Sequence, residues 1–432
     1  MLSQATRAVL DELTELLAED SAAPISAELI EELRRRWLKD RPADTAGLES
    51  LLDTLQNRFD SGARPSALDD GALLGYRLAR ARPAARAPSD VARLQPKPSG
   101  AQRAEGAAPP KQLGWNYPVY FATNRSAQHR NGGFVGFTSR RSDIVTRGRC
   151  QVWVPRNRGF GTLGTPWWQR WARLQFEDDK IRLLATDVLD SEQNRAMLRE
   201  TMAVEQGTKH GLIFLHGYCT SFEDAALRAA QLGSDLEVPG ATAFFSWPSQ
   251  GRFAGYPADG AAIEASEQAI SEFLGMFAEE SGADVVHIVA HSMGNRGLLR
   301  AFQRLLLQQS RARFGQVFLA SPDVDRKLFL DSSQIYQRLS TRTTLYVSPV
   351  DRAVQTSRWL HGADRVGFVP PITVVPNIDT ISVPDVDSDA LGHSSFAGQA
   401  LLRDIFDLLR HDTSPSERQR LVQQGGYHEF LR

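Results

Sequence analysis

Cysteine is scarce in this sequence, and the patterns that go with cysteine-based folds are absent. The 432 residues include only two cysteines, Cys150 and Cys219, and one pair cannot form the disulfide framework of a secreted scaffold. No spacing of cysteine and histidine indicates a zinc site. We therefore expect reduced thiols and no bound metal.

Long apolar runs and an excess of one charge are also missing. No uncharged apolar run approaches the roughly 18 residues of a membrane span. The acidic, amphipathic start of the chain lacks the basic and apolar regions of a signal peptide. The net charge is −1, so no global field attracts a polyanion. We expect a cytoplasmic protein with no transmembrane segment and no nucleic-acid partner.

The composition that remains is that of a globular protein, with 42% hydrophobic and 23% charged residues. Residues 1–80 carry apolar residues at helical spacing, such as Leu13, Leu16 and Leu17, which predicts a small helical domain. Residues 81–112 contain six prolines among many Ala, Arg and Gly residues, which is typical of a linker. Residues 113–432 form the third region.

Strand and helix patterns alternate from Tyr117 onward. Alternation of apolar strands with helices predicts an α/β fold with a mostly parallel sheet covered on both faces. The expected helices span 191–203, 221–235, 260–280, 294–310, 326–338 and 394–410. The expected strands are Val119–Ala122, Cys150–Val154, Ile181–Ala185, Leu212–Leu215, Ala241–Phe245, Val285–Ala290, Val317–Ala320, Thr344–Val347 and Ile372–Val375.

The strongest local motif is Ala290-His291-Ser292-Met293-Gly294, which follows an apolar strand and precedes a helical pattern. It is a G-x-S-x-G motif with alanine in the first glycine position. In this context the serine lies on a sharp strand-to-helix turn that exposes its hydroxyl at the edge of the sheet. Ser292 is therefore the candidate nucleophile; the alternative is an ordinary helix N-cap.

A serine nucleophile needs a base that a third group orients. Hydrolases with this motif place an acid and then a histidine after the serine. Asp351 follows the predicted strand Thr344–Val347, and His393 lies between the last predicted strand and the last predicted helix. Asp351 is the preferred acid, although it could instead cap a helix. The alternative acids are Asp323 and Asp325.

An oxyanion hole requires two backbone donors. Met293, directly after the serine, is one candidate, and Tyr218, in the His216-Gly217-Tyr218 turn after an earlier strand, is the other. Residues near these donors are candidates for lining a substrate pocket. They are His216, Gly217, His291, Trp247 and Gln250, the last two from an aromatic loop after the next strand.

Several of these segments, in this order, resemble a family of bacterial α/β-hydrolases of unknown function (DUF900). The resemblance covers roughly residues 116–410 and does not extend to the N-terminal region or the linker. It implies an α/β-hydrolase fold with Ser292, Asp351 and His393 in triad positions. The matching segments are 119–125, 214–218, 221–225, 245–251, 290–296, 320–325 and 391–394.

The resemblance also implies hydrolysis of a carboxylic ester or a related acyl bond. We expect a serine esterase or lipase that forms an acyl-enzyme, acts on a small-molecule or lipid acyl substrate and needs no cofactor. Only about a helix of chain lies between Ala320 and Thr344, so we expect an open site without a large lid. Two alternatives stay open: a lipase or peptidase effector whose partner binds the N-terminal helices, and a non-catalytic scaffold.

Overall fold

The computed structural model describes the part of the chain that carries the predicted α/β region. The described residues are 114–161, 180–251, 255–349, 361–383 and 399–431, together with Asp351, Val354, Ser357 and Arg358. The expected helical domain at 1–80, the expected linker at 81–112 and the candidate base His393 lie outside the described residues.

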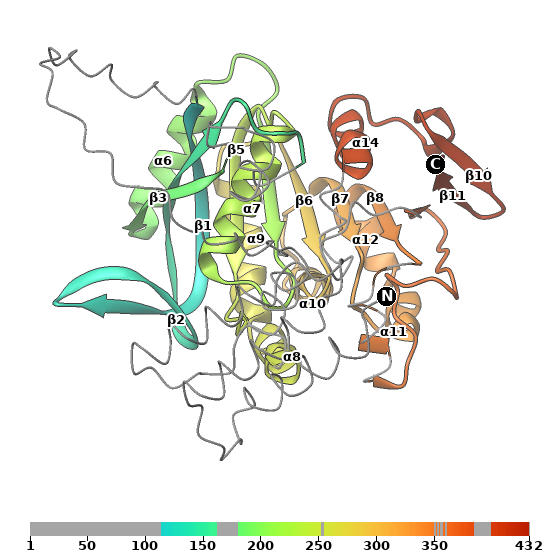
Figure 1. The fold of residues 1–432 in the computed structure, drawn as a ribbon, viewed down its shortest axis with the longest axis horizontal. Coiled ribbons are helices and arrows are strands. Elements are labelled where there is room, and N and C mark those ends of the chain that lie inside the picture. Colours follow the sequence, from blue (N-terminus) through green and yellow to red (C-terminus); the bar gives the residue numbers. More distant parts are fainter. Residues whose placement is uncertain are drawn as a thin grey trace, which may run out of the picture. The chain divides into compact units, whose positions relative to one another are not determined.

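One sheet organises the described chain, in the order β10-β11-β9-β8-β7-β6-β4-β5-β1-β2-β3 (Figure 1). Pairing is parallel from β1 through β5, β4, β6, β7, β8 and β9 to β11, whereas β1-β2-β3 and β10-β11 pair antiparallel. The strands are β1 (Gly114–Arg130), β2 (Gly133–Pro155), β3 (Arg182–Leu189), β4 (His210–Leu215), β5 (Gly240–Ser246), β6 (Val285–His291), β7 (Phe314–Ala320), β8 (Ser340–Val347), β9 (Asp379–Ser382), β10 (Leu421–Gln424) and β11 (Tyr427–Phe430).

Helices cover both faces of this sheet. The helices are α6 (Ser191–Ala203), α7 (Phe222–Asp235), α8 (Tyr256–Ala265), α9 (Glu267–Glu280), α10 (Gly294–Leu307), α11 (Arg326–Ser332), α12 (Gln334–Leu339) and α14 (Gln399–His411). Buried residues of α7 and α14 belong to one core layer, and those of α6, α8, α9, α10, α11 and α12 belong to the other. The expected α/β architecture is therefore confirmed.

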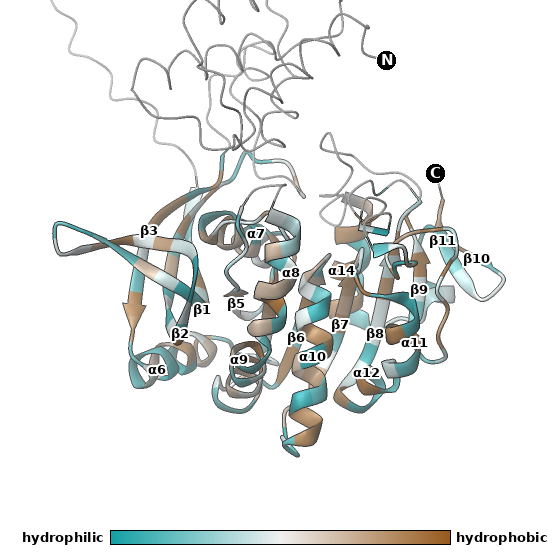
Figure 2. Cartoon of the chain, turned by 90° about the horizontal axis from the view of Figure 1, so that it is seen from below, coloured by the Kyte–Doolittle hydropathy of each residue, from teal (hydrophilic) through white to brown (hydrophobic). Residues whose placement is uncertain are grey.

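The strands divide their side chains between these two layers. In β6, Ile288 and Ala290 pack into one layer while Val289 packs into the other, because successive side chains of a strand point to opposite faces. Figure 2 shows β6 and β7 as hydrophobic, whereas α10 carries both hydrophilic and hydrophobic residues. Strands that are covered on both faces are apolar throughout, so each forms a continuous apolar run in the sequence.

Three predicted elements differ from the structure. The expected helix 326–338 is two short helices, α11 and α12, which meet at Ser333. The expected helix 260–280 is two helices, α8 and α9, which meet at Ser266, and Asn124 Nδ2 donates a hydrogen bond to Ser266 Oγ at 2.9 Å. The expected strand Ile372–Val375 is wrong. That segment follows Pro370 and Pro371 and precedes Pro376, which lack ladder donors. The strand in this place is β9, and the β10–β11 hairpin beyond it was not predicted.

Within the described part of the chain, no helix is long and apolar enough to cross a membrane.

Candidate active site

Ser292 occupies the turn between β6, which ends at His291, and α10, which begins at Gly294. Its φ is 51°, in a backbone region that non-glycine residues rarely adopt. Strained residues of this kind persist only where the surrounding structure holds them, and they concentrate at functional sites. The predicted strand–turn–helix context of the serine is thus present, with the strain that a nucleophile elbow requires.

Neighbouring backbone holds this turn in place. Ser292 N donates to Ala320 O at 2.9 Å, and Asp323 N donates to Ser292 O at 3.1 Å. Asn295 Nδ2 donates to the carbonyl oxygens of Ala290 and Ser292 at 3.0 and 3.1 Å. The loop after β7 and the first turn of α10 therefore fix the backbone on both sides of Ser292.

Two glycines allow the loop after β4 to lie against the elbow. A Cβ on Gly294 would lie 2.6 Å from the carbonyl oxygen of His216 and 2.7 Å from that of Leu215. A Cβ on Gly217 would lie 3.0 Å from Ser292 Cβ and 2.9 Å from His291 Nδ1. All four distances are shorter than those that real Cβ atoms normally show. The structure thus brings Gly217, His291 and Ser292 together.

The surroundings of Ser292 differ in one respect from the expected open site. As predicted, the connection from β7 to β8 is short and contains only α11 and α12. Ser292 is nevertheless only 1% exposed. The absence of a large insertion at this connection therefore does not leave Ser292 open to solvent, and Gly217 of the loop after β4 lies directly against it.

Buried charges tie the loop after β4, which carries Tyr218, to the loop after β5. Asp259 accepts hydrogen bonds from Cys219 N at 3.1 Å, Ser249 Oγ at 2.6 Å and Gln250 N at 2.7 Å. Burial raises the pKa of Asp259, while these hydrogen bonds and Arg125 oppose that rise. The candidate oxyanion donor Tyr218 thus lies in a loop with fixed backbone.

Arg125 makes a second connection between the same two loops. Its Nη2 donates to Thr220 O at 2.7 Å, its Nη1 to Ser249 O at 3.0 Å and its Nε to Ser246 Oγ at 2.8 Å. Burial lowers the pKa of Arg125 to about 10, so its guanidinium is still charged at neutral pH. Asp259 and Arg125 were not selected from the sequence, because nothing in their local pattern reveals that they meet.

The candidate pocket residues His216 and Trp247 lie inside the molecule. They are 1% and 0% exposed, and their rings stack with centroids 4.9 Å apart. Trp247 Nε1 donates to His216 O at 2.9 Å. Burial, together with Arg125, lowers the pKa of His216 to about 3, so this imidazole is neutral at pH 7. Gln250 is partly exposed, and His291 is buried.

Asp323 is the centre of a buried polar network beside the elbow. Its carboxylate accepts hydrogen bonds from Tyr256, from Ser357 and, at 2.9 Å, from Arg296 Nη2. Burial alone would raise the pKa of Asp323, but Arg296, Ser357, Tyr256 and Arg365 together hold it below its usual value. Tyr256 also packs edge-on against Tyr218, with ring centroids 5.3 Å apart. This network links α8, α10 and the segment after β8.

The other two candidate acids have different surroundings. Asp325 caps α11, and its Oδ1 accepts from Leu328 N at 3.0 Å. Asp351 is fully buried after β8, and its Oδ1 accepts from Val354 N at 3.0 Å. Among the described residues, no group of three or more His, Cys, Asp or Glu side chains is placed to hold a metal ion.

Similarity to known proteins agrees with this fold. The model of the family described as "Alpha/beta hydrolase of unknown function (DUF900)" matches residues 190–410, which is more than half of the chain. No protein of curated function matches the sequence.

The solved structures that match this chain include three proteins of low identity. An uncharacterized protein from Bacillus cereus is 13% identical, with a TM-score of 0.32, and the match covers 57% of this chain and 68% of that one. The NocB thioesterase domain is 15% identical (TM-score 0.27; 48% and 95% covered). An arylesterase is 12% identical (TM-score 0.31; 69% and 87% covered). These likenesses are too weak to carry an argument about function.

The family assignment therefore rests on the family model, and the parallel sheet and the serine elbow are consistent with it. By that match, the chain belongs to the DUF900 family of α/β-hydrolases.

Proposed function

We propose that the protein is a serine hydrolase that cleaves a carboxylic ester or a related acyl bond through an acyl-enzyme. The observation that carries this proposal is the conformation of Ser292, which has a φ of 51° between β6 and α10 and lies against Gly217. An ordinary helix N-cap adopts an extended backbone, as Asp190 and Ser221 do at α6 and α7. The strained turn at Ser292 favours a nucleophile over a cap.

Asp351 is the proposed acid of the triad. The rival Asp323 already accepts hydrogen bonds from Arg296, Tyr256 and Ser357, so both of its oxygens are committed to this network. Asp325 is engaged in capping α11. Asp351 also accepts a capping bond from Val354 N, but it follows β8, where the sequence order of the family places the acid.

His393 is the proposed base, on the strength of its sequence position after β9 and before α14. It accepts the proton of Ser292 Oγ while that oxygen attacks the acyl carbon. The resulting oxyanion accepts hydrogen bonds from the backbone N–H groups of Met293 and Tyr218. The alcohol then leaves with the proton from His393. Water repeats the sequence in reverse, giving the free acid and regenerating Ser292.

Labelling with a fluorophosphonate probe tests this assignment. We expect the folded wild type to be labelled, and Ser292→Ala and His393→Ala to lose the label. Ser332→Ala and His129→Ala are matched controls away from the elbow and should retain it. Absence of labelling in folded wild type would contradict the proposal and favour a non-catalytic scaffold.

A further inference from the structure

The buried imidazole of His216 has a polar partner at each ring nitrogen. Its Nδ1 lies 2.7 Å from Gly217 O, and its Nε2 lies 3.4 Å from Ser246 Oγ. Of these two partners, the serine hydroxyl can donate a hydrogen bond, whereas the carbonyl oxygen can only accept one. The neutral ring therefore donates from Nδ1 to Gly217 O and accepts at Nε2 from Ser246.

Arg125 sets the direction of these hydrogen bonds. Its Nε donates to Ser246 Oγ at 2.8 Å, and an arginine N–H can only donate. A lone pair of Ser246 Oγ thus faces Arg125, and its proton is available to His216 Nε2. Burial and this guanidinium lower the pKa of His216 to about 3, although the carbonyl groups of Gly217 and Trp247 oppose the fall. Arg125 thereby disfavours a second proton on the ring.

Packing and further hydrogen bonds hold these three residues in place. The ring of Trp247 stacks on that of His216 with 14° between the two planes, and Trp247 Nε1 donates to His216 O. Thr123 Oγ1 donates to Ser246 O at 2.5 Å and accepts from Arg125 N at 3.1 Å. The ends of β1, β4 and β5 thus meet around a series of hydrogen bonds with one direction.

The series ends on the peptide group that carries the proposed oxyanion donor. Gly217 O and the Tyr218 N–H belong to one peptide group, which is trans, so the two bonds point in opposite directions. A hydrogen bond that fixes the direction of Gly217 O therefore also fixes the direction of the Tyr218 N–H. This peptide group lies beside the nucleophile, since a Cβ on Gly217 would lie 3.0 Å from Ser292 Cβ.

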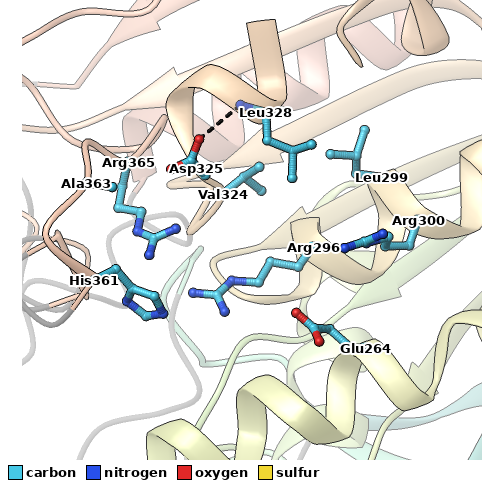
Figure 3. A pocket seen from close by; sticks show the side chains of 10 residues that line it. All are labelled: Glu264, Arg296, Leu299, Arg300, Val324, Asp325, Leu328, His361, Ala363 and Arg365. Carbon is cyan, nitrogen blue, oxygen red and sulfur yellow. Dashed lines mark hydrogen bonds between the residues drawn. The ribbon is translucent and has the colours of Figure 1, made fainter. Parts of the chain in front are cut away.

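The side chain of Tyr218 is held by a separate set of contacts. Its ring packs edge-on against Tyr256, whose Oη accepts a hydrogen bond from Arg296 Nη2 at 2.6 Å. The ring of Tyr256 also packs edge-on against His361, with centroids 5.6 Å apart, and Figure 3 shows the guanidinium of Arg296 directed toward His361. These contacts fix the ring of Tyr218, whereas the hydrogen bond from His216 acts on its peptide group.

We propose that Arg125, Ser246 and His216 are positioning residues of the oxyanion hole. They aim the Tyr218 N–H at the oxyanion of the proposed reaction, so this inference rests on the proposed function. The opposite tautomer of His216 would place the lone pair of Nδ1 against Gly217 O, and two facing acceptors would turn the peptide group together with its N–H. A misdirected donor lowers turnover rather than binding, because the charge on the oxyanion develops in the transition state.

Steady-state kinetics with p-nitrophenyl butyrate tests the positioning role. His216→Leu should lower kcat by about 10²-fold, the effect of losing one oxyanion donor, while KM changes by less than about threefold. His216→Asn keeps an N–H on an atom bonded to Cγ, as Nδ1 is, and should recover about tenfold of that loss. Ser246→Ala removes the donor to Nε2 and should lower kcat by about tenfold, so it remains informative if His216→Leu does not fold.

His287→Leu is the matched control. His287 is also a buried histidine with a pKa lowered to about 3, but it lies in the amino-terminal half of β6. This variant should lose stability and keep kcat within about twofold of wild type. An equal loss of kcat in His287→Leu, or a loss in His216→Leu that appears only in KM, would overturn the positioning role.

The tautomer of His216 is measured without catalysis. Nitrogen NMR of full-length Ser292→Ala protein labelled with ¹⁵N-histidine distinguishes a protonated ring nitrogen from a bare one. The signals of His216 are those that disappear when His216→Asn is added. We expect a proton on Nδ1 and none on Nε2 at pH 7, and the reverse arrangement would overturn the proposal.

The kinetic and NMR measurements separate this proposal from the hydrolase assignment. Ester hydrolysis by wild type, with an unchanged kcat in His216→Leu and Ser246→Ala, would support the hydrolase and overturn the positioning role. A folded wild type that is neither labelled by the fluorophosphonate nor active on the ester would contradict the hydrolase and, with it, the positioning role, even with the proton on Nδ1.

Discussion

The two ends of strands β4 and β6 each carry a pair of histidines, and the pairs have different surroundings. Toward the amino ends, His210 and His287 stack with centroids 5.1 Å apart, and Nδ1 of His210 lies 2.8 Å from Nε2 of His287. At the carboxyl ends, His216 and His291 flank the loop around Gly217, and His291 precedes the strained Ser292.

This difference shows how position decides the role of one residue type. Gln316 N donates to Nδ1 of His287 at 3.0 Å, so we infer that Nε2 of His287 carries the proton that His210 accepts. That pair satisfies its own hydrogen bonds and is part of the packing. At the carboxyl edge, loops from β4, β5, β6 and β7 meet, and this is the edge at which open α/β sheets bind their ligands. We therefore expect chemistry at the carboxyl edge and stability effects at the other.

The largest expected effect is that of Ser292→Ala on turnover. Removing the nucleophile should lower kcat for an activated p-nitrophenyl ester by about 10⁴-fold or more, because the attacking oxygen is lost. His287→Gln, at the opposite ends of the strands, should change kcat by less than about twofold. Steady-state kinetics on both folded variants measures this difference in kcat. A loss of kcat in His287→Gln as large as that in Ser292→Ala would contradict the assignment of chemistry to the carboxyl edge.

The next effect is a loss of stability on acidification. Burial, together with Arg125, lowers the pKa of His216 to about 3. Burial, together with His210, lowers the pKa of His287 to about 3 as well. The unfolded chain takes up protons at these groups below pH 6.5 and the folded chain does not, so stability falls as pH falls toward 3. Between pH 7 and pH 5 each histidine should remove about 2 kcal/mol from the free energy of unfolding.

Urea unfolding at pH 7 and pH 5 measures this loss. His287→Gln should reduce the loss by about 2 kcal/mol, because it removes one of the two buried histidines. His129→Gln, an exposed site, is the control and should show the wild-type loss. An unchanged pH dependence in His287→Gln would show that His287 is protonated in the folded state.

A third prediction concerns the glycine contacts at the elbow. Gly294→Ala should lower the free energy of unfolding by about 3 kcal/mol, because the new Cβ would meet two carbonyl oxygens of the chain that cannot rotate away. Gly207→Ala is the matched control, since no atom lies within 4 Å of its added Cβ. Chemical denaturation compares the two, and equal effects would contradict the close packing of β4 against the elbow.

The smallest expected effect is that of Tyr256→Phe. This variant removes the hydroxyl that binds Asp323 and Arg296 and should cost about 1.5 kcal/mol, since its partners are charged. Tyr117→Phe removes a neutral bond to Thr242 at 2.8 Å and should cost about 1 kcal/mol or less. Thermal unfolding of both variants measures these two losses of stability. A larger loss in Tyr117→Phe than in Tyr256→Phe would contradict the role of the Asp323 network.

Local pattern predicted much of the fold, for identifiable reasons. Apolar runs in β4 to β8 are strong signals because those strands are buried on both faces, and α6 has the predicted bounds, 191–203. Weaker signals failed. Ile372–Val375 is apolar but lies between prolines, and the short strands β9 to β11 carry too few residues for a period to be recognised.

The candidate site likewise combines features that the local sequence predicts with features that it does not. The sequence by itself determined the serine elbow, because a strand, a turn flanked by the small residues Ala290 and Gly294, and a helix are consecutive in the chain. It also supplied the order of Ser292, Asp351 and His393, and these roles remain proposals. Nothing local could reveal that Arg125 and Asp259 connect two loops.

Only the tertiary structure decided that Asp323 is committed to Arg296, Tyr256 and Ser357, and that Arg365 is buried within ion-pair distance of the same carboxylate. The physical reason is the range of the interactions. Helix and strand periods follow from neighbours within a few residues, whereas a buried charge is defined by the partners that folding brings to it from distant parts of the chain.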